Sequence, residues 1–420
     1  MGRTLRPDQL HGHPGRLRRR ALRGRHEAGG RRRARARQGA RLHGHRCPLD
    51  RAGAGLGLHD DRRRHRLRTD GGRGEAADRP GRGAAVSARP KLKVGLTRDL
   101  LTPSGTPSFG QGPLEILERE PSIDWEFIPE AATEITPDIA ARYDLLYVNS
   151  LPVTRASVAR PDRRVRLIAR HGVGYDSVDV PAMTEAGVVV TNTPVAIRRP
   201  VSVAVLTMLF AFAGRLFAKD RLTRAGRWNE RTGHMGLGLT TRTLGVIGVG
   251  GIGAELLTLA RPFGWRMLAA DPYVPAATIA GFGATRLPLD EMLPQCDFVV
   301  SVCILNDETR HLMNAARFAL MKREAFFVNL ARGPVVDERA LIDALRAGTI
   351  AGAGLDVFEQ EPVDPANPLL AMDNVIVTPH ALCWTDECFD AIAREGLGCV
   401  AAFARGEPPK SMVNPGAWRG

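Results

Sequence analysis

Residues 243–271 read TLGVIGVGGIGAELLTLARPFGWRMLAAD, and this stretch decides the fold. It opens on an apolar run that is too short for a helix and has the length of a buried parallel strand. Three glycines with the spacing G-x-G-x-x-G follow, at Gly248, Gly250 and Gly253. A helix with an apolar side and a second short strand are predicted next, and that strand ends on Asp271, 18 residues after the last glycine.

Each part of this stretch has a physical role in holding a dinucleotide. Gly248 permits a tight turn, Gly250 lets the backbone approach a pyrophosphate, and Gly253 lets the helix pack closely on the strand. The N-terminus of the helix offers free N–H groups and a partial positive charge to the phosphates. Asp271 can accept hydrogen bonds from the adenosine ribose, and its charge would repel a 2′-phosphate. The stretch therefore predicts an NAD site and favours NAD over NADP.

Charge is distributed unevenly along the 420 residues, a length that suggests two or three domains. The formal net charge is +14, but residues 1–90 contain 25 Arg, no Lys and 8 acidic residues, a net of +17, which leaves −3 for residues 91–420. The basic balance belongs to the N-terminal segment alone. We therefore expect no nucleic-acid partner for the remainder of the chain.

Residues 1–90 form a segment rich in Arg, Gly, Ala and His, without an aromatic residue or an apolar period. Such a composition buries too little apolar surface to offset the entropy of ordering, so the segment is predicted to be a disordered extension. It lacks the apolar core of a secretory signal. A basic arm that touches nucleic acid or anionic surfaces is one interpretation. A non-functional extension, translated from upstream of the real start, is favoured because no aromatic side chain is present to stack on bases.

The cysteine and hydropathy patterns indicate in which cellular compartment the protein is expected. The six cysteines are scattered singly, with no C-x-x-C pair and no metal-ligand spacing. This usage is typical of a reducing cytoplasm, and no metal site is predicted. The longest apolar candidate, residues 201–213, is shorter than a membrane span. We expect a cytoplasmic protein with no membrane association.

Short apolar strands alternate with helices on both sides of the glycine-rich stretch. Before it, strands are predicted at 91–97, 125–128, 145–149, 165–169 and 188–191, with helices at 113–120, 137–142 and 199–215. After it, strands are predicted at 298–303, 326–330, 350–357 and 375–378, with a helix at 337–347. Residues 224–242 are predicted to be a loop. This alternation indicates an α/β protein with two doubly wound parallel sheets.

Three polar residues are predicted to meet at one edge of the second sheet. Arg332 and His380 lie at the carboxyl ends of predicted strands, where open α/β sheets bind their ligands, and Glu361 lies in a loop after another strand. Taken singly, each has an ordinary alternative: a surface ion pair for Arg332, loop chemistry for Glu361 and a satisfied core histidine for His380. Their joint position beside the dinucleotide favours a functional set.

A further glycine-rich turn follows the strand at 165–169. In the sequence RHGVGYD, residues 170–176, Gly172 and Gly174 are predicted to leave backbone N–H groups open, which could hold a small carboxylate. An ordinary turn between a strand and a helix is equally consistent with these residues.

Taken together, these motifs resemble those of the D-isomer-specific 2-hydroxyacid dehydrogenases over residues 91–420. The resemblance rests on GVGGIG at 248–253 with Asp271, VNLARGPVVDE at 328–338, DVFEQEP at 356–362 and TPH at 378–380. It implies a Rossmann NAD-binding domain, residues 194–379, inserted in a flavodoxin-like substrate domain formed by residues 91–193 and 380–420. It also implies a cleft between the two domains and a homodimer.

The resemblance also implies a set of site residues. Its catalytic residues correspond to Arg332, Glu361 and His380 here. Its cofactor contacts, with the glycine motif, correspond to Gly248, Gly250, Gly251, Ile252, Gly253, Asp271, Leu330, Ala331, Arg332, Asp356 and His380. Its substrate-binding residues correspond to Val173, Gly174 and Arg332.

Residue chemistry fits transfer of hydride between NAD(H) and a small 2-hydroxy or 2-keto acid, of the glyoxylate, hydroxypyruvate or 3-phosphoglycerate class. His380 can donate a proton to the carbonyl oxygen, or accept it in the reverse direction. Glu361 can hydrogen-bond the other ring nitrogen and orient the ring. Arg332 can hold a planar carboxylate through two N–H groups. An alternative is a non-enzymatic, NAD-sensing interaction protein of the corepressor type on the same fold.

The chain departs from the pattern of the family at three places. Val203 stands where the family often has an acid, and Val302-Cys-Ile304 replaces the usual His-x-Pro. Trp384 follows the histidine where small residues are common, and we expect it to narrow the substrate site or to contact the substrate. These departures bear on the class of substrate rather than on the reaction.

Overall fold

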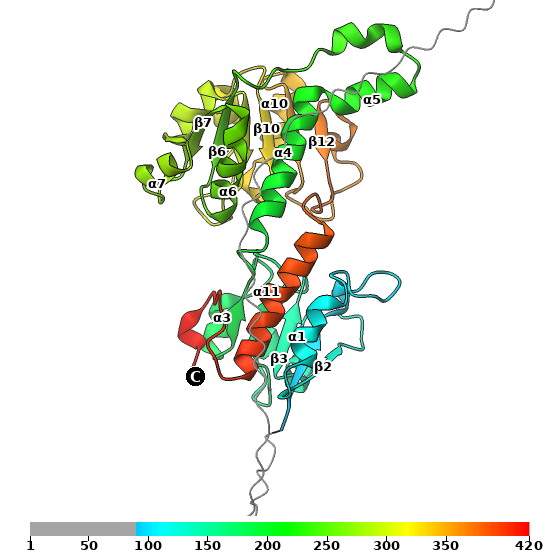
Figure 1. The fold of residues 1–420 in the computed structure, drawn as a ribbon, viewed down its shortest axis with the longest axis vertical. Helices are drawn as coiled ribbons and strands as arrows, with labels where there is room; N and C mark the ends of the chain where they lie inside the picture. The colour runs from blue at the N-terminus through cyan, green and yellow to red at the C-terminus, as the bar shows by residue number, and fades with distance from the viewer. Residues whose placement is uncertain (1–89, 420) are drawn as a thin grey trace, which may run out of the picture. The chain divides into compact units, whose positions relative to one another are not determined.

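The computed structural model describes residues 90–419, which contain two parallel β-sheets flanked by helices (Figure 1). The predicted extension, residues 1–90, lies outside the described residues except for Pro90. All strand pairs in both sheets are parallel. The α/β class and the two parallel sheets predicted from the sequence are confirmed.

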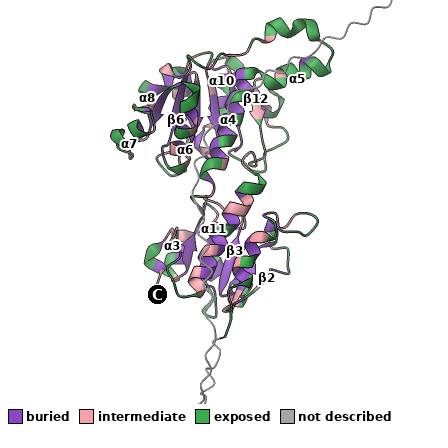
Figure 2. Cartoon of the chain, in the orientation of Figure 1, coloured by how far each residue is buried: buried purple, intermediate pink, exposed green. Residues whose placement is uncertain are grey.

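The first sheet has five strands in the order β2-β1-β3-β4-β5, the flavodoxin-like order. Its strands are β1 (Leu92–Leu96), β2 (Ile123–Phe127), β3 (Leu145–Val148), β4 (Leu167–Arg170) and β5 (Val189–Thr191). Its helices are α1 (Glu115–Glu118), α2 (Pro137–Arg142), α3 (Val180–Glu185) and α11 (Asp386–Ala404). The central strands are buried on both faces, as expected of a parallel sheet covered by helices (Figure 2).

The C-terminal segment completes the first sheet. The side chains of Ala393, Leu397 and Val400 on α11 join the core formed by β1, β3 and β4. After α11 the chain returns to the free edge of β5, where the N–H of Val413 donates to the carbonyl of Val190 at 2.8 Å. The amide side chain of buried Asn414 then accepts from the N–H of Val190 at 2.7 Å and thereby acts as a further strand partner.

The second sheet has seven strands in the order β12-β11-β10-β9-β6-β7-β8. These strands are β6 (Thr243–Ile247), β7 (Arg266–Ala270), β8 (Thr285–Arg286), β9 (Phe298–Ser301), β10 (Phe326–Asn329), β11 (Gly352–Leu355) and β12 (Val375–Val377). In chain order this is the Rossmann arrangement 3-2-1-4-5-6 with a seventh strand added at one edge.

The helices of this part of the chain have local causes in the sequence. They are α4 (Arg198–Gly214), α5 (Leu216–Arg224), α6 (Gly251–Ala260), α7 (Ala276–Gly281), α8 (Leu289–Met292), α9 (Ala315–Leu320) and α10 (Glu338–Ala347). The carboxylate of Asp337 caps α10 by accepting from the N–H of Ala340 at 3.0 Å, and left-handed Gly348 ends it. Helix α4 packs against β11 at Gly354, where a Cβ atom would lie only 2.8 Å from the sulfur of Met208.

Most predicted elements are present, with some corrections at their ends. Strand β9 ends at Ser301 rather than at Cys303, and β11 ends one residue before Asp356. The predicted loop at 224–242 contains a 3-10 helix, Trp228–His234. Among residues 90–419, no single helix could span a membrane, although α4 and α5 pass the length and composition test as a pair bent by 56°.

Removal of the Asn414 side chain is expected to destabilise the fold. In Asn414→Ala, the buried N–H of Val190 loses its acceptor, and the bonds from the amide nitrogen to Thr184 Oγ1 and the carbonyl of Val188 are also lost. We expect the free energy of unfolding to fall by about 2–3 kcal/mol, since an unsatisfied buried donor carries its desolvation penalty. Urea denaturation measures this. Arg339→Ala, which removes an exposed ion pair with Asp343, is the control and should change stability by less than about 0.5 kcal/mol.

Candidate active site

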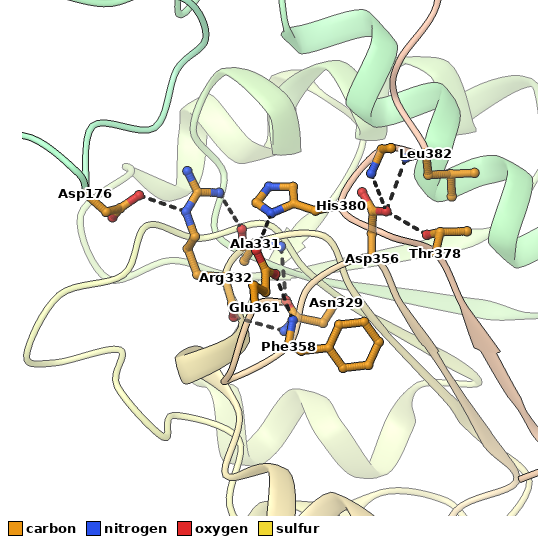
Figure 3. A network of polar contacts seen from close by, with 11 residues as sticks. Asp176, Asn329, Ala331, Arg332, Asp356, Phe358, Glu361, Thr378, His380 and Leu382 are labelled. Carbon is orange, nitrogen blue, oxygen red and sulfur yellow. Dashed lines mark hydrogen bonds and ion pairs between the residues drawn. The ribbon is translucent and has the colours of Figure 1, made fainter. Parts of the chain in front are cut away.

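The turn after β12 presents His380 in a conformation that its neighbours fix. His380 has φ of 54°, in the left-handed region that few non-glycine residues adopt. One oxygen of buried Asp356, which follows β11, accepts from Thr378 Oγ1 at 2.6 Å and from the N–H groups of Ala381 and Leu382 at 3.0 and 3.1 Å (Figure 3). The carboxylate of Asp356 therefore binds the backbone on both sides of the histidine and holds the turn.

His380 and Glu361 form a close pair. Nδ1 of His380 lies 2.7 Å from Oε2 of Glu361, and the other oxygen of Glu361 accepts from the N–H of Phe358 at 3.0 Å. Partial burial raises the pKa of Glu361, but the hydrogen bonds from His380 and Phe358 and the charge of Arg332 outweigh it, so the net pKa is lowered. The imidazole side chain is 47% exposed, and the hydrogen bond to Glu361 is made by Nδ1, not by the other ring nitrogen.

Arg332 extends from the turn after β10, and buried Asn329 shapes that turn. The side-chain oxygen of Asn329 accepts from the N–H of Ala331, and its nitrogen donates to the carbonyl of Arg332, both at 3.0 Å. The next residue, Gly333, packs backbone against backbone, because a Cβ there would lie 1.7 Å from the carbonyl oxygen of Phe358. The arginine turn and the loop that carries Glu361 are thus in direct contact.

The guanidinium of Arg332 reaches the glycine-rich turn after β4. Its Nε donates to the carboxylate of Asp176 at 2.9 Å, and its Nη1 donates to the carbonyl of Ala331 at 2.7 Å. A Cβ on Gly174 would lie 1.7 Å from Nη2 of Arg332, so this position has no room for a side chain while the arginine is there. Arg332, Glu361 and His380 lie together in Figure 3, as the strand ends predicted.

The prediction that Gly172 leaves its N–H open was wrong. That N–H donates to Oγ1 of Thr193 at 3.0 Å, because the residues after β5 lie against this turn. Within residues 90–419, no acceptor is found for the N–H groups of Val173 and Gly174, while the carbonyl of Val173 accepts from Asn192 at 2.8 Å. The N–H groups that remain for an anion are therefore those of the two predicted substrate-binding residues.

The glycine loop after β6 has the geometry that a dinucleotide needs. Gly248 has φ of 91°, and a Cβ there would lie 2.7 Å from the Cα of Cys303. A Cβ on Gly253 would lie 2.1 Å from the carbonyl oxygen of Gly248, so helix α6 packs directly on the turn. Gly250 is exposed, with open space where its Cβ would be, and no side chain of the described residues caps α6. The first N–H groups of α6 are therefore available to a phosphate.

Asp271 lies beside this loop at the end of β7. One of its oxygens accepts from the N–H of Val249 at 2.8 Å, and the other accepts from the N–H groups of Tyr273 and Val274 at 2.9 and 3.1 Å. These bonds fix the carboxylate and leave lone pairs for further donors, since a carboxylate offers about four acceptor sites. The residues present fit NAD: open glycine backbone for the pyrophosphate and a fixed acid for a ribose.

Three further predicted cofactor contacts have side chains that are buried or partly buried. Leu330 and Ala331 are buried, whereas Ile252 is partly buried at the start of α6. No cluster of His, Cys, Asp and Glu suited to a metal ion is present in the described part of the chain. The sequence reading missed Asn329 and Asp176 as contacts of the arginine. A polar residue at the end of a buried strand was the available signal for Asn329, the last residue of β10.

The chain is similar in sequence to proteins of one known family. A model of the D-isomer specific 2-hydroxyacid dehydrogenase NAD-binding domain matches residues 206–381. A glyoxylate reductase of Korarchaeum cryptofilum is 39% identical over 262 residues, which cover 62% of this chain and 79% of that protein. This chain belongs to the D-isomer specific 2-hydroxyacid dehydrogenase family.

A second relative and a solved structure are also similar to this chain. A D-3-phosphoglycerate dehydrogenase of Methanocaldococcus jannaschii is 38% identical over 64% of this chain, and the match spans 52% of that protein. The structure of a D-lactate dehydrogenase of Aquifex aeolicus, in complex with NAD and lactic acid, is similar with a TM-score of 0.67 and 26% identity. That similarity covers 76% of this chain and 99% of the other. NAD is the cofactor of this domain.

A methyl group at Gly174 is expected to displace Arg332 without unfolding the protein. In Gly174→Ala the new Cβ takes the place of Nη2, the end of a flexible side chain. The KM for a keto acid should rise about tenfold or more, since one charge-assisted contact is lost, while the Kd for NADH stays within twofold. Steady-state kinetics and NADH fluorescence measure these. Gly398→Ala, where a Cβ meets nothing within 4 Å, is the control. An unchanged KM would contradict this placement of the guanidinium.

Proposed function

We propose that this member of the family reduces a small 2-keto acid with NADH, and that its substrates are of the glyoxylate, hydroxypyruvate or 3-phosphoglycerate class. The observation that carries the proposal is the His380–Glu361 pair at 2.7 Å, with an accessible ring, beside Arg332. Relatives named as glyoxylate reductase and D-3-phosphoglycerate dehydrogenase support this class of substrate. Trp384 follows in the same loop and is proposed to limit the size of the acid.

In the proposed reaction, the protein residues position the acid and move one proton. Bound NADH supplies the hydride. His380 donates the proton to the carbonyl oxygen through its free nitrogen, while Glu361 keeps the ring oriented. In the oxidation direction the same nitrogen accepts the proton. This needs no further acid or base at the site.

The substrate carboxylate is proposed to bind between two sets of donors. The N–H groups of Val173 and Gly174 form one set, and the guanidinium of Arg332 forms the other, which lies against Gly174. A carboxylate that binds here replaces Asp176 as the partner of Arg332. The exchange costs little, because the side chain of Asp176 is 52% exposed and exposed ion pairs contribute little to stability.

The cofactor contacts and domain limits are proposed on the same grounds. Gly248, Gly250, Gly251, Ile252, Gly253 and Asp271 would hold the pyrophosphate and ribose; Leu330, Ala331, Arg332, Asp356 and His380 would lie toward the nicotinamide. Residues 194–379 would form the NAD-binding domain, and residues 91–193 with 380–420 the substrate domain. The hydrogen bonds of the C-terminal segment to β5 support this division.

We also propose a cytoplasmic homodimer. Helix α5 is coloured as exposed over most of its length in Figure 2. On α5, the 3-10 helix after it and the residue that follows, an exposed apolar group is formed by Leu216, Phe217, Trp228 and Met235, which are 48–75% exposed. Exposed apolar groups of this kind mark protein contact surfaces. The unpaired cysteines of the described residues suit a reducing compartment.

Turnover with 2-keto acids tests the proposed function. We expect NADH oxidation with glyoxylate or hydroxypyruvate, or NAD reduction with 3-phosphoglycerate. In His380→Ala, kcat should fall at least about 100-fold, the usual contribution of a positioned acid–base group, with NADH affinity within twofold. Full activity in that variant would remove the catalytic assignment. No turnover with any of the acids in the wild type would leave the interaction-protein alternative.

Substitution of Glu361 is expected to change the pH dependence. Its lowered pKa keeps the carboxylate charged below its ordinary value of 4.5, so the contribution of the pair is present above that pH and is lost as pH falls through the lowered pKa. In Glu361→Gln no carboxylate remains to be protonated at this position. The loss of reduction that follows protonation of Glu361 on the acid side should therefore be absent from the pH–rate profile of this variant. An unshifted pH–rate profile would show that Glu361 only supports the loop.

Charge on the exposed apolar group is expected to separate the dimer. Sedimentation velocity should give a dimer for the wild type and a monomer for Phe217→Glu combined with Trp228→Glu, because burial of two carboxylates at an interface is costly. Leu370→Glu, at an exposed apolar residue elsewhere, is the control and should stay dimeric. A wild-type monomer would rule out the homodimer.

A further inference from the structure

The first residue of α4, Arg198, lies over the first residue of α6. A Cβ on Gly251 would be 2.6 Å from Nε of Arg198, 3.1 Å from its Cδ and 3.2 Å from its Cζ. The side chain of Arg198 is exposed, and its Nε donates to the carbonyl of Pro194 at 3.1 Å. The absence of a side chain at Gly251 therefore leaves the space in which this guanidinium lies.

Contacts between the first turns of α4 and α6 fix this arrangement. The hydroxyl of buried Ser202 donates to the carbonyl of Arg198 at 2.8 Å and lies 3.1 Å from the carbonyl of Ile252. Nε of Arg199, the next residue of α4, pairs at 2.9 Å with Glu255, which lies one turn after Gly251 in α6. The guanidinium of Arg198 is thus held beside the glycine loop by a helix that precedes the loop in sequence.

No negatively charged side chain of the described residues neutralises Arg198 at the N-terminus of α6. Neither α4 nor α6 has an acidic residue in its first turn or a side-chain cap. Glu255 is paired with Arg199, and Glu395 accepts from the N–H groups of Val195 and Ala196 before α4. Within residues 90–419, Arg198 has no carboxylate partner. A cation next to the positive end of a helix is unfavourable by itself, and an anion between the two would be stabilised by both.

We propose that Arg198 binds the pyrophosphate of NAD, together with the N–H groups at the start of α6. A guanidinium suits this role because its forked N–H groups match phosphate oxygens and its charge does not depend on pH. The proposal adds a residue outside the glycine motif to the cofactor site and rests on NAD binding there. Arg199, whose charge is already neutralised by Glu255, has no such role.

Ligand binding tests this without turnover. NADH binding is measured by fluorescence, and ADP-ribose and adenosine are measured as competitors. In Arg198→Gln, we expect the Kd values for NADH and ADP-ribose to rise about tenfold, as for the loss of one charge-assisted contact, and the Kd for adenosine to change less than twofold. The rise of Kd with salt should also be shallower than in the wild type. Arg199→Gln is the matched control and should bind all three ligands within twofold of the wild type.

A compensating variant makes the test independent of folding. In the Arg198→Gln background, Gly251→Arg introduces a new guanidinium whose side chain begins next to the place that the Arg198 side chain occupied. It should recover most of the lost NADH affinity. Unchanged ADP-ribose affinity in Arg198→Gln would overturn the proposal, and so would an equal loss for adenosine, which would indicate a structural role. Binding of NADH by the wild type is established first, so these outcomes are distinct from failure of the proposed function.

Discussion

A single buried carboxylate, that of Asp356, holds the backbone on which the site depends. A left-handed conformation at a non-glycine residue such as His380 costs about 1–3 kcal/mol. Three hydrogen bonds to one oxygen of Asp356, from Thr378, Ala381 and Leu382, offset this cost. Because β11 and β12 are neighbours in the sheet, the acid that follows one strand reaches the turn that follows the other. The pairing of β11 with β12 therefore determines how the turn that carries the imidazole of His380 is held.

Charges of opposite sign alternate across the site. Asp176 lies against Arg332, whose charge helps to lower the pKa of Glu361, and Glu361 in turn lies against His380. Each of these four side chains is at least partly exposed and has an ionisable partner, so none of them is a buried charge without a partner. This arrangement keeps Arg332 extended toward the turn at Gly174 before any ligand arrives. An incoming carboxylate then replaces one carboxylate by another, and the arginine need not be ordered anew.

The strands and the three polar residues were predictable from the sequence, but the contacts that support them were not. Periodicity located β6 and β7, and the strand-end rule brought Arg332 and His380 together. The bond from Gly172 to Thr193 joins residues 21 apart, in the turns that follow β4 and β5, and local sequence pattern does not reveal it. Helix α11 was not predicted because its apolar residues serve two cores: Cys388 and Ile392 pack in one, and Ala393 and Leu397 in the other. No single apolar stripe results.

The glycines of the nucleotide motif are equivalent in sequence but not in structure. Gly248 is needed for its positive φ, Gly253 for direct contact with a carbonyl oxygen, and Gly250 for the open space above it. Gly251 differs from these, because what fills its space is a side chain from another helix, α4. The residue at this position of the motif is therefore constrained by an element outside the β6–α6 unit. The effect of a substitution at each glycine depends on that neighbour: backbone atoms cannot yield to a new methyl group, whereas an exposed arginine can.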